Sequence, residues 1–208
     1  MIRGRRPLAA VALGVLLPLS SSCVVVGSTP APSTGAGPSG TATAVPADEA
    51  TAVEQDMAQA VFHRVNAERE ARGLPPLSWD DDLAAVARGW NTVMAERDRL
   101  GHQDLGSLLG QEPLGDLEGL GENVFQATGP VPAGTVHAGW MRSDDHRVNV
   151  LQPGWDRLGI AVLCADDGSV WATQEFGRTA GAGLPAVASE TPPPEPLVRP
   201  EDDGPRCG

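Results

Sequence analysis

The hydrophobic pattern predicts a long helix where the folded part of the chain begins. Apolar side chains recur at four-residue steps and form one stripe of a helix, at Val53, Met57, Val61 and Val65. Thr51 and Glu54 make a capping box at the start of this pattern, and Gly73 marks its end. His63 falls off the stripe, which favours a surface or packing role for it.

Two further helices are predicted downstream. The first covers residues 78–98, where an acidic first turn precedes an apolar face made of Leu83, Val86, Ala87, Trp90, Val93 and Met94. The second covers residues 133–141, with Val136 and Trp140 facing inward and His137 as a surface or packing residue.

A β-hairpin is predicted to close the folded part. Leu158, Ile160 and Val162 alternate with smaller residues, DDG at 166–168 supplies a turn, and SVWATQEFG forms the return strand. Residues 100–132 are rich in glycine, and we expect an irregular segment there. Helices first and strands last predict an α+β domain in which helices cover a small antiparallel sheet.

The two ends of the chain differ from its middle. Residues 1–22 have the arginines, apolar stretch and small residues of a secretory signal peptide. Residues 23–47 are uncharged and rich in proline and small residues, which predicts a flexible linker. Residues 179–208 form a tail rich in proline and acid, so the folded domain is predicted at 48–178. We expect a protein that is secreted or anchored to the outer face of the cell membrane.

The three cysteines fit an exported protein. Cys23 follows the apolar stretch, where bacterial lipoproteins carry the cysteine that becomes acylated, so we predict lipidation there and membrane attachment through that lipid. Cys164 and Cys207 then remain as one disulfide, which oxidising conditions outside the cytoplasm allow. The alternative is ordinary cleavage near Ser22, which leaves an odd thiol.

Charge and motifs exclude several functions. The formal net charge of -12 repels phosphate backbones, so nucleic acid is not an expected partner. The sequence contains no HExxH, GxSxG or CxxC motif and no Walker-type loop. Candidate chemistry therefore rests on isolated histidines and carboxylates.

Three such residues have unusual local surroundings. His102 lies in the loop LGHQDLG, Glu122 in GLGENVF and His146 in SDDHRVN. Each has a structural alternative: a solvated histidine, a turn glutamate, and a helix start with Ser143 as its N-cap. The local pattern leaves both interpretations open.

Five short motifs, taken in order, resemble one family. They are VNAEREARGLPPLSWDDDLAAVARGW, GH, GEN, WMRSDDHRVNVLQPGWDRLGIAV and WATQEFG. Their order and spacing over about residues 57–177 resemble the CAP superfamily of cysteine-rich secretory proteins, antigen 5 and pathogenesis-related 1 proteins, also called SCP-like domains. The form WMxSxxHRxN resembles its bacterial branch. The resemblance implies an α-β-α sandwich with a surface cleft.

The resemblance also implies a site. Many members carry two histidines and two glutamates in the cleft, and His102 and Glu122 match the first histidine and the glutamate of the GEN motif. Ser143 stands where the second glutamate is expected, and Trp171 where the second histidine is expected. His146 comes from the bacterial motif, and we expect it near the same cleft.

Two classes of function follow. The leading hypothesis is a non-enzymatic, exported module that binds a small molecule, a lipid or a cell-envelope component through His102, Glu122, Ser143 and His146. Two histidines and a glutamate can hold a zinc-like ion with an open position, so zinc is the candidate cofactor and His102, His146 and Glu122 its ligands. The alternative is a hydrolase that uses the same cleft. It would be metal-assisted, or serine-type with Ser143 as nucleophile beside His146 and Glu122 orienting the imidazole.

A third, purely structural role for the same residues, which would join loops to the core, also stays open.

Overall fold

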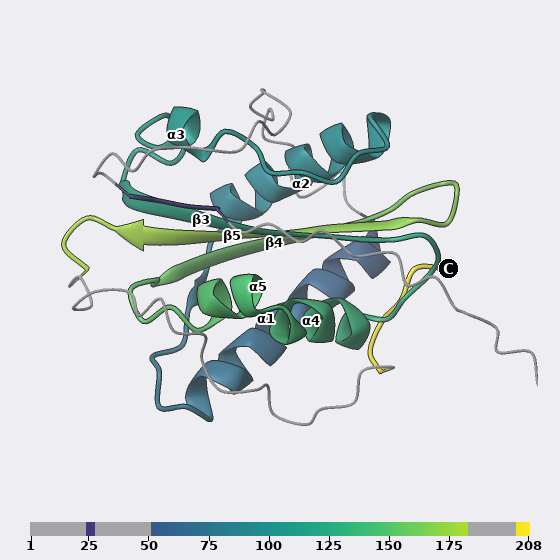
Figure 1. The fold of residues 1–208 in the computed structure, drawn as a ribbon, viewed down its shortest axis with the longest axis horizontal. Coiled ribbons are helices and arrows are strands. Elements are labelled where there is room, and N and C mark those ends of the chain that lie inside the picture. Colours follow the sequence, from purple (N-terminus) through teal and green to yellow (C-terminus); the bar gives the residue numbers. More distant parts are fainter. Residues whose placement is uncertain (1–23, 28–50, 183–202) are drawn as a thin grey trace, which may run out of the picture.

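The computed structural model describes residues 24–27, 51–182 and 203–208, and of residues 24–27 only the backbone. Within this part, a five-stranded sheet lies between two layers of helices (Figure 1). The helices are α1 (Ala52–Glu70), α2 (Asp81–Glu96), α3 (Leu105–Leu108), α4 (Ala133–Arg142) and α5 (Asp144–Val150). Helices α2 and α3 cover one face, and α1, α4 and α5 cover the other. The predicted α+β class and α-β-α sandwich are confirmed.

The predicted hairpin forms the centre of the sheet. The strands are β1 (Val24–Gly27), β2 (Ser78–Trp79), β3 (Leu117–Ala127), β4 (Arg157–Cys164) and β5 (Val170–Thr179). They lie in the order β1-β3-β5-β4-β2, with parallel pairing between β2 and β4 and antiparallel pairing elsewhere. The DDG turn joins β4 to β5, where Ala165 N donates to Ser169 O at 2.9 Å and Gly168 has a φ of +83°.

Helix α1 carries the predicted stripe and cap. Met57, Val61 and Val65 are completely buried and pack in a core with Trp140, Leu158 and Phe176. The capping box is present, because the Thr51 hydroxyl accepts from Glu54 N and the Glu54 carboxylate accepts from Thr51 N. This apolar face holds α1 against the sheet, because its burial removes a continuous stripe of apolar surface from water.

Helix α2 lies unusually close to the other face of the sheet. Its predicted apolar residues Leu83, Trp90 and Met94 are buried. The close approach depends on Gly159 of β4, where a Cβ would lie 2.1 Å from the backbone nitrogen of Ala84. Only a glycine lets the helix backbone and the strand backbone approach so closely.

The segment 100–132 is more ordered than predicted. It contains α3 and the eleven-residue strand β3, which pairs with β5 along almost its whole length. Two glycines hide the strand pattern, and one of them has a packing reason: a Cβ on Gly121 would lie 2.7 Å from Cζ2 of Trp155. The expectation of an irregular segment was therefore wrong for 117–127.

The linker prediction was wrong for residues 24–27. These residues form β1, whose backbone pairs with β3 in the register Val24 to Glu122 and Gly27 to Gly119. Three of these four residues are valine, whose branched side chain favours a strand, and the small residues of the rest of the predicted linker hid this signal. The predicted signal peptide, Cys23 and most of the predicted linker and tail lie outside the described residues.

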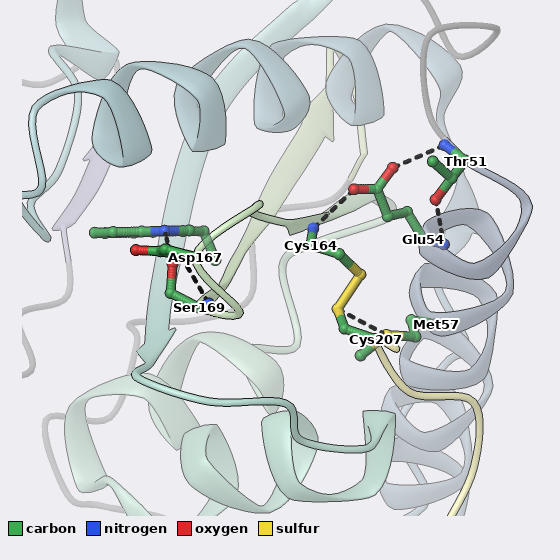
Figure 2. Close-up of a disulfide and its surroundings, with 8 residues drawn as sticks. Thr51, Glu54, Met57, Cys164, Asp167, Ser169 and Cys207 are labelled. Atoms are coloured by element: carbon green, nitrogen blue, oxygen red, sulfur yellow. Dashed lines mark hydrogen bonds between the residues drawn. A yellow bond between two sulfur atoms is a disulfide. The ribbon is translucent and has the colours of Figure 1, made fainter.

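The end of the chain packs onto the domain. Cys164 and Cys207 form the predicted disulfide, which joins the end of β4 to the C-terminal segment (Figure 2). Pro205 O accepts from Ala133 N at 2.9 Å, and Asp203 O accepts from Gly134 N at 3.1 Å. Because the N-cap of α4 is Pro132, which supplies no side-chain cap, residues 203–205 provide the missing acceptors.

Candidate functional site

The register of β3 and β5 brings two glutamates together. Glu122 of β3 lies directly opposite Glu175 of β5 in the antiparallel ladder. Side chains on a strand alternate between faces, and Val124 of β3 packs with Trp90 of α2, so Glu122 points to the α2 and α3 side. Both glutamates are buried there, with 0% and 1% of their surface exposed.

The loop between α2 and α3 carries His102 to this pair. Trp90 anchors the loop, because its Nε1 donates to Gly101 O at 2.8 Å. The next residue, His102, places Nδ1 2.5 Å from Oε1 of Glu122. The His102 side chain is 9% exposed and that of Glu122 is fully buried, so the imidazole is the outer member of the pair. The two residues that the GEN and GH motifs predict are therefore in contact.

Gln103 joins the two glutamates. Its Nε2 donates to Oε2 of Glu122 at 3.0 Å and to Oε1 of Glu175 at 2.6 Å. Its backbone N also donates to Oε1 of Glu122 at 3.3 Å. Both oxygens of Glu122 are thus bound by groups of one short loop, which fixes the carboxylate beneath His102.

The environment of Glu175 favours its neutral form. Complete burial is the largest cause that raises its pKa well above the ordinary value, followed by the charge of Glu122 and a side-chain hydrogen bond with it. The bond from Gln103 acts in the opposite direction and is smaller. A carboxyl group that stays protonated beside a carboxylate is the usual outcome when two acids share one buried place.

His146 lies on α5, which packs on the other face of the sheet, and Ser143 directly precedes that helix. Asn123, whose side chain alternates with that of Glu122, donates through Nδ2 to the backbone oxygen of His146 at 3.1 Å. His146 is buried, with 2% of its surface exposed. Ser143 occupies the predicted N-cap position of α5, but its side chain makes no capping hydrogen bond.

Asparagines connect α5 to the GEN strand. Asn149 Nδ2 donates to the backbone oxygen of Glu122 at 3.1 Å and to Oδ1 of Asn123 at 3.0 Å. Asn123 Nδ2 in turn donates to Oε1 of Gln174 at 3.0 Å. Through these bonds α5 supports the backbone of the site from the opposite face of the sheet, while the Glu122 carboxylate points away from α5.

The predicted zinc ligands do not fit a metal ion in this arrangement. Both oxygens of Glu122 bind protein donors, and Nδ1 of His102 is engaged by Glu122. Among the described residues, no group of three histidine, cysteine, aspartate or glutamate side chains is placed to hold a metal ion. The structure brings His102 and Glu122 together and does not add His146 to them as a third ligand.

Trp171, which replaces the second family histidine, is part of the core. It is buried with Trp90, Met94 and Val124. Its Nε1 donates to Oγ of Ser169 at 3.0 Å. This position therefore contributes apolar packing on the α2 side of the sheet.

Gln103 and Glu175 were missed by the sequence analysis. Gln103 directly follows the candidate His102, and this neighbouring position was the only, weak, indication that it belongs to the site. Glu175 shares the face of Trp171 and Thr173 in the strand motif WATQEFG, so an acid stands at a position that alternation assigns to the interior. An acid at an interior position of a predicted strand was the available signal.

Relatives with similar sequences include two proteins of Bacillus subtilis (strain 168). The chain is 32% identical over 122 residues to the uncharacterized protein YkwD, and the match covers 57% of this chain and 46% of that protein. It is 31% identical over 106 residues to the uncharacterized membrane protein YlbC, and that match covers 49% of this chain and 30% of the relative. The chain thus spans less than half the length of these relatives.

Solved structures with the same fold come from other bacteria. An extracellular protein containing an SCP domain from Bacillus anthracis str. Ames is 29% identical, with a TM-score of 0.53, over 65% of this chain and 44% of that one. An outer surface protein from Borrelia burgdorferi gives a TM-score of 0.55 at 17% identity, over 62% of this chain and 97% of that one. The second likeness supports the fold alone. No helix among the described residues is long and apolar enough to cross a membrane.

The family model of the cysteine-rich secretory protein family, CAP, matches residues 62–176, which is more than half of the chain. This range includes all four candidate residues of the sequence analysis as well as Gln103 and Glu175. The match agrees with the motifs, their order and the sandwich that they predicted. The chain therefore belongs to the CAP family of cysteine-rich secretory proteins.

Proposed function

We propose that this chain is an exported CAP-domain protein that binds a ligand through His102. The observation that carries the proposal is the contact of 2.5 Å between His102 Nδ1 and the buried Glu122 carboxylate, with the imidazole as the outer member. A carboxylate that holds one ring nitrogen orients the other one and fixes the tautomer. The result is a pre-organised polar contact for a ligand.

Further observations support export of the protein and a ligand from the cell envelope. The N-terminal residues have the order of a signal peptide. A similar Bacillus anthracis protein is extracellular, and the Borrelia burgdorferi protein is an outer surface protein. A ligand from the cell envelope, either a cell-wall fragment or a lipid, suits a protein at that location. A lipid on Cys23 would keep the domain near such ligands.

The binding proposal can be tested with two probes and a matched pair of variants. The full-length protein is titrated with soluble cell-wall fragments and with phosphatidylglycerol vesicles, and binding is followed by calorimetry. His102→Ala removes the proposed contact, whereas His63→Ala removes an exposed histidine on α1 and serves as the control. Binding that survives in the control and is lost in His102→Ala supports the proposal. Equal binding by all three proteins, or no binding of either probe by the wild type, contradicts it.

A hydrolase is the second candidate, because a carboxylate that orients a histidine is also the arrangement of general-base catalysis. In this site His102 would be the base, since Glu122 binds His102 and Gln103 rather than His146. Hydrolysis of the same cell-wall fragments or lipids is the assay. Activity lost in His102→Ala and kept in Ser143→Ala supports His102 acting on water, and the opposite result supports a serine nucleophile. Metal-assisted hydrolysis is not included, because the ligand set does not fit.

A further inference from the structure

Glu175 is a second buried carboxyl group in the His102 site, and neither the family motifs nor the proposed function assigns a role to it. It lies opposite Glu122 in the β3–β5 ladder and shares the Nε2 group of Gln103 with it. A buried acid is costly unless it is neutral or well paired. Within the described contacts, its polar neighbours are Gln103 and another acid.

We propose that Glu122 and Glu175 hold one proton between them and that Glu175, which carries it, is a positioning residue for His102. This inference rests on the proposed function, in which His102 contacts the ligand. Nε2 of Gln103 lies 3.0 Å from Oε2 of Glu122 and 2.6 Å from Oε1 of Glu175, so the two buried carboxyl groups are close neighbours. Two carboxylates can only accept hydrogen bonds and repel each other, so one proton held between them stabilises the pair. The raised pKa of Glu175, caused mainly by burial, agrees with the proton lying on that residue.

The position of this proton determines which ring nitrogen of His102 carries a hydrogen. If Glu175 donates to Glu122, then Glu122 is the ionised partner and acts only as an acceptor. Gln103 donates to both of its oxygens, and His102 Nδ1 lies 2.5 Å from one of them. The hydrogen between His102 and Glu122 therefore belongs to Nδ1. In neutral His102, Nε2 is then a hydrogen-bond acceptor.

The ligand chemistry follows from this tautomer. An imidazole that presents an acceptor nitrogen binds a group with a hydrogen to donate, such as a hydroxyl. Hydroxyl groups occur both on cell-wall saccharides and on the phosphatidylglycerol headgroup, and the two probes of the binding experiment separate these sources. The Glu175 proton thus favours hydroxyl donors over ligands that offer only acceptors.

The test is nuclear magnetic resonance of the labelled full-length protein without a ligand. The carboxyl carbon of each buried glutamate reports its protonation, and the ring nitrogens of His102 report its tautomer. At pH 7 the wild type is expected to show one protonated carboxyl carbon, assigned to Glu175, and an Nδ1–H form of His102. Glu175→Gln, whose amide can donate to Glu122 in the same way, should lose the protonated signal and keep the His102 tautomer.

A second variant separates positioning from stability. Glu175→Met removes the donor and should shift both ring nitrogen signals of His102. Thr173→Val is the matched control, because Thr173 is buried on the same face of β5 and its hydroxyl hydrogen-bonds with Asn91 Oδ1 at 2.7 Å. It should lower stability without moving those signals.

A Glu175 carboxyl carbon that is ionised at pH 7, or ring nitrogens that do not move in Glu175→Met, would overturn the proposal. If Glu175→Met fails to fold, the wild-type carboxyl signals and Glu175→Gln still decide. Because no ligand is present, the outcome is independent of whether His102 binds one. If the resonance signals contradict the expected protonation or tautomer while His102-dependent binding is observed, this inference alone is rejected. If the signals are as expected but no His102-dependent binding is observed, the proposed function alone is rejected.

Discussion

Glu122 and Glu175 face each other across two adjacent strands, and the single Nε2 group of Gln103 binds both of them. No strand motif alone predicts this contact, because the two glutamates lie far apart in the sequence. The pair links the most conspicuous motif of the sequence, GEN, to a position that the sequence alone assigns to the core. Its main consequence is the buried proton that we propose for the site.

The pair should make stability depend on pH. The folded-state pKa of Glu175 is raised above the ordinary glutamate value of 4.5, so the folded state binds the proton more strongly than the unfolded state. The stabilisation is complete below that value and is lost as the pH rises through the raised pKa, by at most about 1.4 kcal/mol per pH unit. Urea unfolding at successive pH values measures it.

Glu175→Gln is the reference for this measurement, since other carboxylates also contribute to the pH dependence. The difference in unfolding free energy between the wild type and the variant should change in favour of the variant as the pH rises. Parallel curves across the range from acid to alkaline pH would show that Glu175 does not titrate in the folded protein.

The disulfide should stabilise the domain and protect the start of α4. Replacing Cys164 and Cys207 by serine should lower the free energy of unfolding by about 2–4 kcal/mol. Because residues 203–205 accept hydrogen bonds from Ala133 N and Gly134 N, exchange of these two amide hydrogens should accelerate as well. Denaturant unfolding and hydrogen exchange measure the two effects.

Arg64→Ala is the control that tests whether an ion pair, and not the disulfide, holds residues 203–205 on the domain. It removes the ion pair with Asp203, whose side chain is 47% exposed, and leaves the disulfide in place; surface pairs of this kind contribute about 0–1 kcal/mol. If the ion pair and not the disulfide holds the tail, Arg64→Ala will accelerate exchange at Ala133 and Gly134 as much as the serine variant does.

Glu54 should contribute more to the stability of the domain than an ordinary helix-capping residue does. Its carboxylate accepts from Thr51 N at 2.7 Å and from Cys164 N at 2.7 Å, so it joins the start of α1 to the end of β4 (Figure 2). Glu54→Ala leaves both donors without this acceptor, which should cost about 2 kcal/mol. Thr51→Ala removes the cap alone and should cost about 1 kcal/mol. Thermal unfolding of the two variants compares them, and equal losses would mean that the bond to Cys164 contributes nothing.

The close contact between α2 and β4 should tolerate no side chain at position 159. Gly159→Ala places a methyl group 2.1 Å from the Ala84 nitrogen, and a helix backbone cannot move aside as a side chain can. We expect a loss of about 3 kcal/mol or more. Gly129→Ala, where a Cβ meets nothing within 4 Å, should change stability by less than about 0.5 kcal/mol. Comparable denaturation midpoints for the two variants would refute the packing argument.

Periodicity predicted those elements whose own residues determine their packing. The stripe of α1 buries one face of the helix. Strand β4 is buried on both faces, but its large side chains alternate with small ones, so both patterns are visible in a short window. Strand β3 was missed because Gly119 and Gly121 interrupt its alternation, and Gly121 is explained by Trp155, which lies far along the chain. A short sequence window contains no information about such a neighbour.

The same distinction applies to the site. His102 and Glu122 were found because short motifs resemble a family, and the structure places them in contact. The partnership of His146 with them was an extrapolation from another motif, and α5 packs on the other face of the sheet. Glu175 depends on strand register, which is fixed by pairing across the whole β3–β5 ladder rather than by local residues.

Because β1 is part of the sheet, the folded domain begins before its first helix. Its four residues cover the outer edge of β3 at Glu122 and the residues just before it. A shortened chain that starts at residue 48 would leave that edge with unpaired backbone donors and acceptors. Two such molecules could then pair edge to edge, so the shortened protein would self-associate through the strand that carries the site.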